Sequence, residues 1–197
     1  MRKVMSLLAL ALTTVTLLSP PTRAAETPGA PADLHFTLKD QNGHEVALSS
    51  YAGQILVLEW VNMDCPFVQR HYREGTMKTL AQKYAAKGVV WLAINSTHYA
   101  TQADNKKWVQ QHALPYPILD DSSGQVGRAF DARTTPDMFI LQHGKIVYQG
   151  AIDNDPSGRK GPQAVNYVAR ALDEILAGKP VSIPKTRSYG CSVKYNR

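Results

Sequence analysis

Two cysteines, Cys65 and Cys191, are the residues of this chain best suited to chemistry. Cys65 lies in the stretch NMDCPFVQRHY, residues 62–72, where strand-forming residues end and Pro66 can begin a helix. The helix dipole and the unpaired N–H groups of a first helical turn stabilise a thiolate, the reactive form of cysteine. Three nearby side chains (Arg70, His71 and Arg73) add positive charge. The position therefore predicts that Cys65 is a nucleophile with a lowered pKa.

The partner of Cys65 is not where a redox dithiol would place it. Val68 stands three residues later, where such a motif carries its second sulfur. Two thiols in an oxidising compartment either form a bond or carry out redox chemistry. A permanent bond between Cys65 and Cys191, with 125 residues between them, would stabilise the fold by about 4–5 kcal/mol. The other reading is a cycle in which Cys65 attacks a substrate disulfide or an oxidant and Cys191 resolves the product.

The functional reading is favoured because a structural cysteine does not need to stand where a helix begins. The glycine before Cys191 also predicts a tail that can move.

The first 24 residues have the layout of a cleaved export signal, with Arg2 and Lys3, a short apolar run and small residues up to Ala24. We expect an exported protein, periplasmic or secreted, without stable membrane insertion once the signal is removed. Removing the signal leaves 19 basic and 16 acidic residues, a net charge of +3 that predicts no nucleic-acid partner. The six histidines have no ligand spacing with each other or with the cysteines, so we expect neither metal nor cofactor.

The remaining 173 residues suit one compact domain. Residues 25–32 form a flexible lead-in, 33–178 the domain, and 179–197 an extended C-terminal tail that carries Cys191. Strands are expected at 35–39, 44–48, 54–62 and 88–96, a short strand or extended segment at 115–121, and a hairpin at 137–153. Helices are expected from Pro66, from a Thr76 cap to Gly88, and at 100–114, 124–130 and 161–179. This order predicts an α/β fold, a central mixed sheet flanked by helices.

These motifs, taken in order, resemble the thioredoxin-like redoxin family, which includes peroxiredoxin-like (AhpC/TSA-like) and TlpA-like exported proteins. The strand–Cys–Pro–helix unit, the Thr-Thr-Pro before DMFIL and the closing hairpin and helix carry the resemblance over residues 33–178. The tail motif YGCSVKY resembles that of an exported subgroup. The resemblance gives Cys65 the role of the attacking cysteine and Thr135-Pro136 that of a cis-proline loop facing its sulfur. Glu59, six residues before Cys65, corresponds to a buried acid that handles protons.

The peroxide-reducing branch of this family differs at three positions. Its motif needs a proline at Leu58 and a hydroxyl residue at Asn62, and its arginine would fall near Pro136, where Arg133 comes close. The leading hypothesis is therefore an exported thiol-disulfide oxidoreductase, an enzyme that acts on protein or small-molecule disulfides or peroxides and is regenerated by a thiol reductant. A peroxiredoxin-like antioxidant protein and a non-catalytic module with a structural disulfide remain as alternatives.

Four smaller expectations concern the surroundings of these residues. Asp64 and His71 should be solvated, the pKa of Glu59 should rise if the side chain is enclosed, and the three tryptophans should pack in or near the core.

Overall fold

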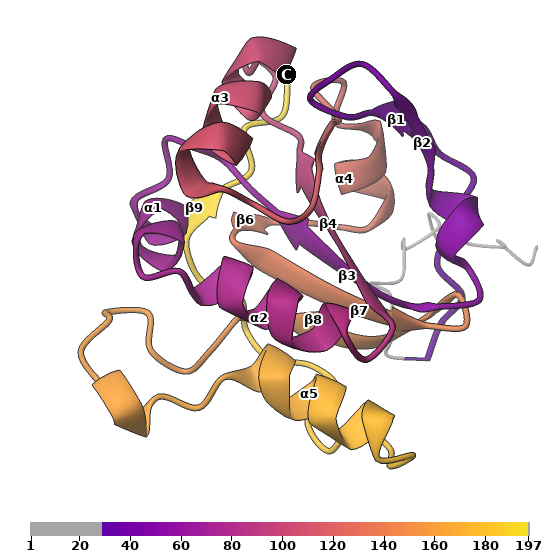
Figure 1. Ribbon diagram of the computed structural model, residues 1–197, viewed down its shortest axis with the longest axis vertical. Coiled ribbons are helices and arrows are strands. Elements are labelled where there is room, and N and C mark those ends of the chain that lie inside the picture. Colours follow the sequence, from indigo (N-terminus) through magenta and orange to yellow (C-terminus); the bar gives the residue numbers. More distant parts are fainter. Residues whose placement is uncertain (1–28, 197) are drawn as a thin grey trace, which may run out of the picture.

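A seven-stranded mixed sheet forms the centre of the computed structural model, which describes residues 29–196 (Figure 1). The strand order is β2-β1-β5-β4-β3-β7-β8, where the pairs β3·β4 and β4·β5 are parallel and the others antiparallel. The strands are β1 (Thr37–Lys39), β2 (Glu45–Ala47), β3 (Ile55–Trp60), β4 (Val89–Asn95), β5 (Ile118–Asp120), β7 (Asp137–Gln142) and β8 (Lys145–Gly150). The predicted mixed sheet flanked by helices is confirmed. The proposed signal segment, residues 1–24, lies outside the described residues.

The helices cover both faces of this sheet. They are α1 (Pro66–Arg73), α2 (Thr76–Ala85), α3 (Gln102–His112), α4 (Gln125–Ala129) and α5 (Tyr167–Leu176), with short 3-10 turns η1 (Leu48–Tyr51) and η2 (Gly161–Gln163). Apolar side chains of α1, α2 and α5 pack in one core cluster, and those of η1 and α4 pack in the other. Because strand side chains alternate between faces, Val57 and Val61 belong to the first cluster and Leu56 and Leu58 to the second.

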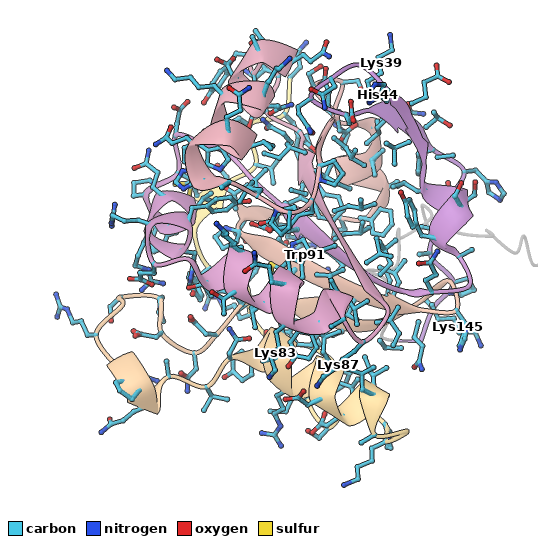
Figure 2. The ribbon with its side chains drawn as sticks, in the orientation of Figure 1. Lys39, His44, Lys83, Lys87, Trp91 and Lys145 are labelled. Atoms are coloured by element: carbon cyan, nitrogen blue, oxygen red, sulfur yellow. The ribbon has the colours of Figure 1, made fainter. Side chains whose placement is uncertain are left out.

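Lysine side chains lie at the surface of the molecule, and the tryptophans lie in or against its core. Figure 2 shows Lys39 and Lys145 at the edge of the molecule and Lys83 and Lys87 next to each other between α2 and α5, whereas Trp91 lies between the sheet and α2. Trp60 and Trp91 are buried and Trp108 packs against the core, as predicted. None of the described helices is long and apolar enough to cross a membrane.

Two helix starts differ from those predicted. Gly75, in the left-handed conformation, caps α2, so Thr76 is its first residue and not its cap. The long helix expected over 161–179 begins only at Tyr167, where the Asn166 side chain accepts a hydrogen bond from the Ala169 N–H. The preceding residues leave the helical path because Asp153 and Asn166 form a β-bridge, which leaves Val165 exposed.

The C-terminal tail crosses the sheet's end as an extended segment and forms one short strand. Strand β9 (Cys191–Ser192) pairs antiparallel with β6 (Thr134–Thr135), so that Cys191 lies opposite Thr135 (Figure 1). The tail is also fixed beyond this pair, since the Tyr195 hydroxyl donates to the Ala132 carbonyl oxygen at 2.8 Å.

Gly190 is required by close packing, and not by the mobility that the sequence suggested. Its φ is +132°, and a Cβ atom placed there would come within 2.1 Å of the Thr135 carbonyl oxygen. Only glycine adopts this conformation readily, and only glycine leaves room for the neighbouring loop.

We expect Gly190→Ala to separate β9 from β6 and to lower the free energy of unfolding by about 2–3 kcal/mol, through backbone strain together with the clash. Gly178→Ala is the control, because Gly178 also has a positive φ but nothing lies near its Cβ position. The control should lose about 1 kcal/mol in urea denaturation, and the tail amides should lose hydrogen-exchange protection only in Gly190→Ala. Equal losses would contradict the packing explanation.

Candidate redox site

Cys65 is the residue that caps α1. Its backbone is extended, its N–H donates to the Asn62 carbonyl oxygen, and its own carbonyl oxygen accepts the first helical hydrogen bond from the Gln69 N–H. Pro66 follows as the first helical residue, as the sequence predicted. The sulfur therefore lies at the mouth of the helix, where the Val68 N–H is near enough to lower the thiol pKa although it forms no capping hydrogen bond of normal geometry.

The Thr135-Pro136 loop covers the sulfur, as the family resemblance implied. The peptide bond between these residues is cis. The Cys65 thiol donates to the Thr135 carbonyl oxygen at 2.9 Å. The Thr135 hydroxyl is buried without a conventional hydrogen-bond partner among the described residues, and it is close enough to the sulfur to favour the ionised form. The loop thus has one group that holds the thiol and another that can hold the thiolate.

Cys191 reaches the same place from the tail. Both cysteines are free thiols, and the pairing of Cys191 with Thr135 brings the Cys191 N–H and thiol close to the Cys65 sulfur. Cys65 is only 1% exposed, whereas Cys191 is partly exposed. The structure therefore brings together four of the predicted site residues: Cys65, Thr135, Pro136 and Cys191.

The pKa values of the two thiols are shifted in opposite directions. Burial raises the pKa of Cys65, but hydrogen bonding from the Thr135 hydroxyl, the N–H groups of Val68 and Cys191 and the Cys191 thiol lowers it below that of an ordinary cysteine. Burial, together with the neighbouring Cys65 sulfur and its charge, raises the pKa of Cys191 to about 11. A thiolate shared by this pair is consequently held on Cys65, which makes Cys65 the better nucleophile at neutral pH and the better leaving group.

A partly buried polar cluster holds the tail next to the cysteines. The Tyr189 hydroxyl donates to the Asp153 carboxylate at 2.6 Å, and it lies 3.0 Å from Nε2 of His71 and 3.3 Å from Nη2 of Arg70. The Tyr189 ring also packs against Phe67. Tyr189 is two residues from Cys191 and His71 lies in α1, so this cluster joins the tail to the helix that presents Cys65.

His71 is therefore not the solvated residue that was expected. It is 1% exposed, because it lies on the inner side of α1 beneath Tyr189. Burial is the main cause that lowers its pKa, to about 4, so the imidazole is neutral at physiological pH. Asp64, by contrast, is exposed as predicted, and its carboxylate accepts a hydrogen bond from the Tyr99 hydroxyl at 3.0 Å.

Glu59 is fully buried in β3, and it binds other residues rather than Cys65. Its Oε2 accepts hydrogen bonds from the Trp91 indole at 2.9 Å and the Tyr116 hydroxyl at 3.3 Å. Burial raises the pKa of Glu59 to about 7, as predicted for an enclosed acid. No hydrogen bond joins Glu59 to Cys65 in residues 29–196, so a direct proton transfer between them stays a prediction.

Other residues of the sequence argument lie away from the sulfur. Arg133 extends into solvent and pairs with Asp131, at 2.7 Å between Nη2 and Oδ2. Val68 is fully buried and fills the place of the missing second cysteine. Asp137, which the sequence did not single out, is buried directly after Pro136, and burial raises its pKa to about 7. Within the described part of the chain, no group of three His, Cys, Asp or Glu residues could hold a metal ion.

Comparison with known proteins supports the same fold and chemistry. The model of the AhpC/TSA family matches residues 28–149. A solved structure of a hypothetical protein from Sinorhizobium meliloti is 28% identical, with a TM-score of 0.78 over 88% of this chain and 97% of that one.

Among curated relatives, a probable phospholipid hydroperoxide glutathione peroxidase of Helianthus annuus is 36% identical over 45% of this chain and 48% of its own length. The thiol-disulfide oxidoreductase ResA of Geobacillus kaustophilus is 29% identical over 58% of this chain and 63% of its own length. The chain thus spans about half to two thirds of these relatives. The predicted thioredoxin-like redoxin fold is confirmed.

Replacing Tyr189 by Phe should weaken the Cys65–Cys191 disulfide without changing the Cys65 thiol itself. The variant loses the hydrogen bonds to Asp153 and His71, worth about 1 kcal/mol net, so the effective concentration of Cys191 near Cys65 should fall roughly fivefold. Redox titration against dithiothreitol measures this quantity. Tyr51→Phe, in η1, is the control and should leave the potential unchanged; an unchanged potential in Tyr189→Phe would show that the cluster does not position the tail.

Replacing Glu59 by Gln should change how stability depends on pH. The folded pKa of Glu59 is raised from 4.5 to about 7, so between these values the unfolded chain is ionised while the folded chain keeps its proton. The wild type should therefore lose stability as the pH rises from 4.5 to 7, by up to about 3 kcal/mol.

Urea denaturation at several pH values provides the measurement. The difference in unfolding free energy between wild type and Glu59→Gln should grow across this window in favour of the variant. Above it the difference should become constant, because Glu59 is then ionised in both the folded and the unfolded chain. Asp137 titrates equally in both proteins, so its contribution cancels. A difference that does not vary with pH would mean that Glu59 keeps an ordinary pKa.

Proposed function

The chain belongs to the AhpC/TSA family, and from this premise we propose that it is an exported thiol-disulfide oxidoreductase in which Cys65 is the nucleophile and Cys191 the resolving cysteine. The observation that carries the proposal is the asymmetric thiol pair at the start of α1. The pKa of Cys65 is lowered, that of Cys191 is raised, and β9 holds the two together. A structural Cys65–Cys191 disulfide would require the two sulfurs to be close, but it would not require their pKa values to differ.

In the first half of the proposed cycle the cysteine pair is oxidised, and the reaction begins at Cys65. The Cys65 thiolate attacks one sulfur of a substrate disulfide, forms a mixed disulfide and releases the other sulfur as a thiolate. The Cys191 thiol then loses its proton, attacks the Cys65 sulfur of the mixed disulfide and expels the second substrate thiolate. The result is a reduced substrate and a Cys65–Cys191 disulfide.

The reducing half begins at Cys191, because only that sulfur is open to solvent. A reductant thiolate attacks Cys191, and Cys65 leaves with the electron pair, favoured by its lowered pKa. A second reductant thiol then releases Cys191 as a thiol and forms the reductant disulfide. Export agrees with this chemistry, since disulfides persist in oxidising compartments.

Peroxide reduction is the second candidate, and one observation favours it. With 1% of its surface exposed, Cys65 is more readily reached by a small oxidant than by a folded protein disulfide. In that case the Cys65 thiolate attacks a peroxide oxygen, and a hydroxide or alkoxide leaves. Cys191 then attacks the resulting sulfenic acid, displaces water and forms the disulfide. Against it, Asn62 replaces the hydroxyl residue of the peroxidase motif, and the Arg133 side chain is exposed and pairs with Asp131.

Single-cysteine variants test the function. Cys65→Ser should lose disulfide reduction to the background level, whereas Cys191→Ser should complete one fast oxidation and then stop, with the substrate thiol trapped on Cys65. Reduction of insulin disulfides and of hydrogen peroxide with a dithiol donor measures both reactions, and peptide mass mapping locates the trapped thiol. If both variants lose only thermal stability and the wild type shows no turnover, the disulfide is structural; faster peroxide than disulfide turnover would put the second candidate first.

A further inference from the structure

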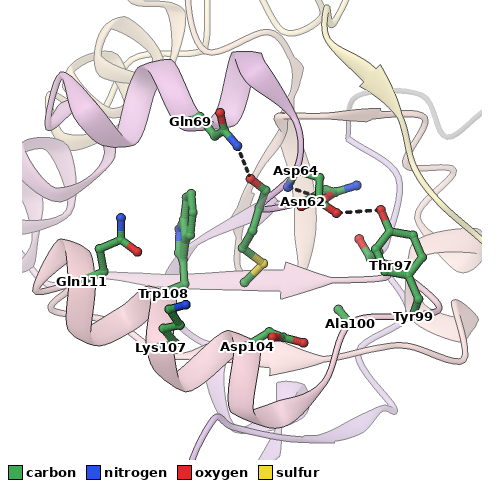
Figure 3. Close-up of a pocket in the computed structure, with 11 residues that line it drawn as sticks. Asn62, Asp64, Gln69, Thr97, Tyr99, Ala100, Asp104, Lys107, Trp108 and Gln111 are labelled. Atoms are coloured by element: carbon green, nitrogen blue, oxygen red, sulfur yellow. Dashed lines mark hydrogen bonds between the residues drawn. The ribbon is translucent and has the colours of Figure 1, made fainter.

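A hollow of about 370 Å³ lies between α3 and the loop that leads to Cys65 (Figure 3). Residues 62–64 form one wall, and Thr97, Tyr99 and the inner side of α3 form the other. Figure 3 shows that the Trp108 ring stands at one end and Tyr99 at the other, where its hydroxyl donates to Asp64. The volume of the hollow is within the range of roughly 300–1,000 Å³ that is common for small-molecule sites.

The hollow is next to the redox centre. Its wall residues 62–64 immediately precede Cys65, and the Asn62 carbonyl oxygen accepts a hydrogen bond from the Cys65 N–H at 3.0 Å. The loop that carries Tyr99 is also joined to the tail, because the His98 N–H donates a hydrogen bond to the Lys194 carbonyl oxygen at 2.9 Å. Tyr99 is also 51% exposed, unusual for a large aromatic ring. A molecule in the hollow would therefore lie near both the start of α1 and the tail segment that carries the partly exposed Cys191.

The walls offer groups for a peptide-like molecule with charges of both signs. Lys107 and Asp104 lie one turn apart on α3, and Asp64 is on the opposite wall. Trp108 and Met63 also line the hollow and supply apolar surface. Thr97 is only 2% exposed, and its buried hydroxyl, like the Trp108 indole nitrogen, has no hydrogen-bond partner in the described residues. Unused polar groups of this kind are uncommon in native structures and suit a ligand that brings a partner.

We propose that this hollow binds the thiol reductant, a low-molecular-mass zwitterionic peptide thiol, and presents its sulfur to Cys191. The proposal rests on the proposed function and names the chemical class of its electron donor. A carboxylate of the thiol pairs with Lys107, its ammonium group with Asp104 or Asp64, and its backbone packs on Trp108. The bound thiolate forms a bond to the Cys191 sulfur, the Cys65–Cys191 bond breaks, and Cys65 takes the electron pair. A second molecule of the thiol completes the two-electron reduction and leaves as the disulfide.

Stopped-flow reduction of the oxidised full chain tests the site, with reduced glutathione as the probe and 2-mercaptoethanol, which is uncharged and small, as the comparison thiol. The disulfide is prepared with diamide, so that the experiment does not depend on turnover. The rate should saturate with glutathione and rise linearly with 2-mercaptoethanol. Acid quenching should trap glutathione on Cys191.

Two variants and one control locate the binding. Lys107→Gln should raise the half-saturating glutathione concentration about fivefold, and Trp108→Ala should raise it further, while the 2-mercaptoethanol rate stays within twofold of the wild type. Lys106→Gln is the control, because Lys106 is the neighbouring exposed lysine on α3 and does not line the hollow. The unchanged rate with 2-mercaptoethanol shows that the variants keep their fold.

Linear kinetics with glutathione, or equal effects of Lys107→Gln and Lys106→Gln, would overturn the site while leaving the proposed function intact. Glutathione trapped on Cys65 would also overturn it. Failure of diamide to produce the Cys65–Cys191 bond would instead overturn the proposed function itself, and the reductant site with it.

Discussion

The pairing of β9 with β6 is the constraint on which the redox centre depends. Two residues of tail backbone, Cys191 and Ser192, pair with Thr134 and Thr135, and this register places the second sulfur against the first. The pairing is possible because Gly190 lets the chain approach the Thr135 carbonyl oxygen. That oxygen also accepts a hydrogen bond from the Cys65 thiol. One short strand pair thus fixes the distance between the cysteines and supplies part of the electrostatic environment of both.

The acidity of the thiols follows from the same arrangement. A sulfur buried as completely as Cys65 would ordinarily be a weak acid, because burial disfavours the charged form. Donor groups from three segments offset this cost: Val68 in α1, Thr135 in β6 and Cys191 in β9. Two of the three are positioned by the strand pair. Cys191 receives no comparable set of donors, and the nearby charge of Cys65 makes its own ionisation less favourable still. The division of roles between the cysteines is therefore a consequence of where the tail docks.

Local patterns predicted the parts of this centre that depend on neighbouring residues. The Cys-Pro helix start and the strands follow from period and turn chemistry, and the family resemblance supplied the cis Thr135-Pro136 bond and the burial of Glu59. The Tyr189 cluster could not be predicted in this way, because it joins α1, the loop after β8 and the tail, which are distant in sequence. His71 was misplaced for the same reason, since a helix pattern alone does not show that a tail covers it. The motif YGCSVKY was the available signal, but it did not indicate which face of the molecule the tail would cross.

The position of the second cysteine also determines how the centre can open. In a dithiol motif both sulfurs belong to the first turn of one helix, so the second sulfur stays beside the first. Here Val68 fills the second place with a buried apolar side chain, which packs α1 more firmly on the sheet. Cys191 is held by the β9–β6 pair, by Tyr189 before the pair and by Tyr195 beyond it, in a tail segment that is separate from α1 and that can open locally without the rest of the fold. Local release of the tail would uncover Cys65 for a larger substrate, and redocking would return Cys191 for resolution, with α1 intact throughout. The loss of the dithiol motif is thus compatible with redox chemistry, because the movement required for exchange is transferred from a helix to a tail.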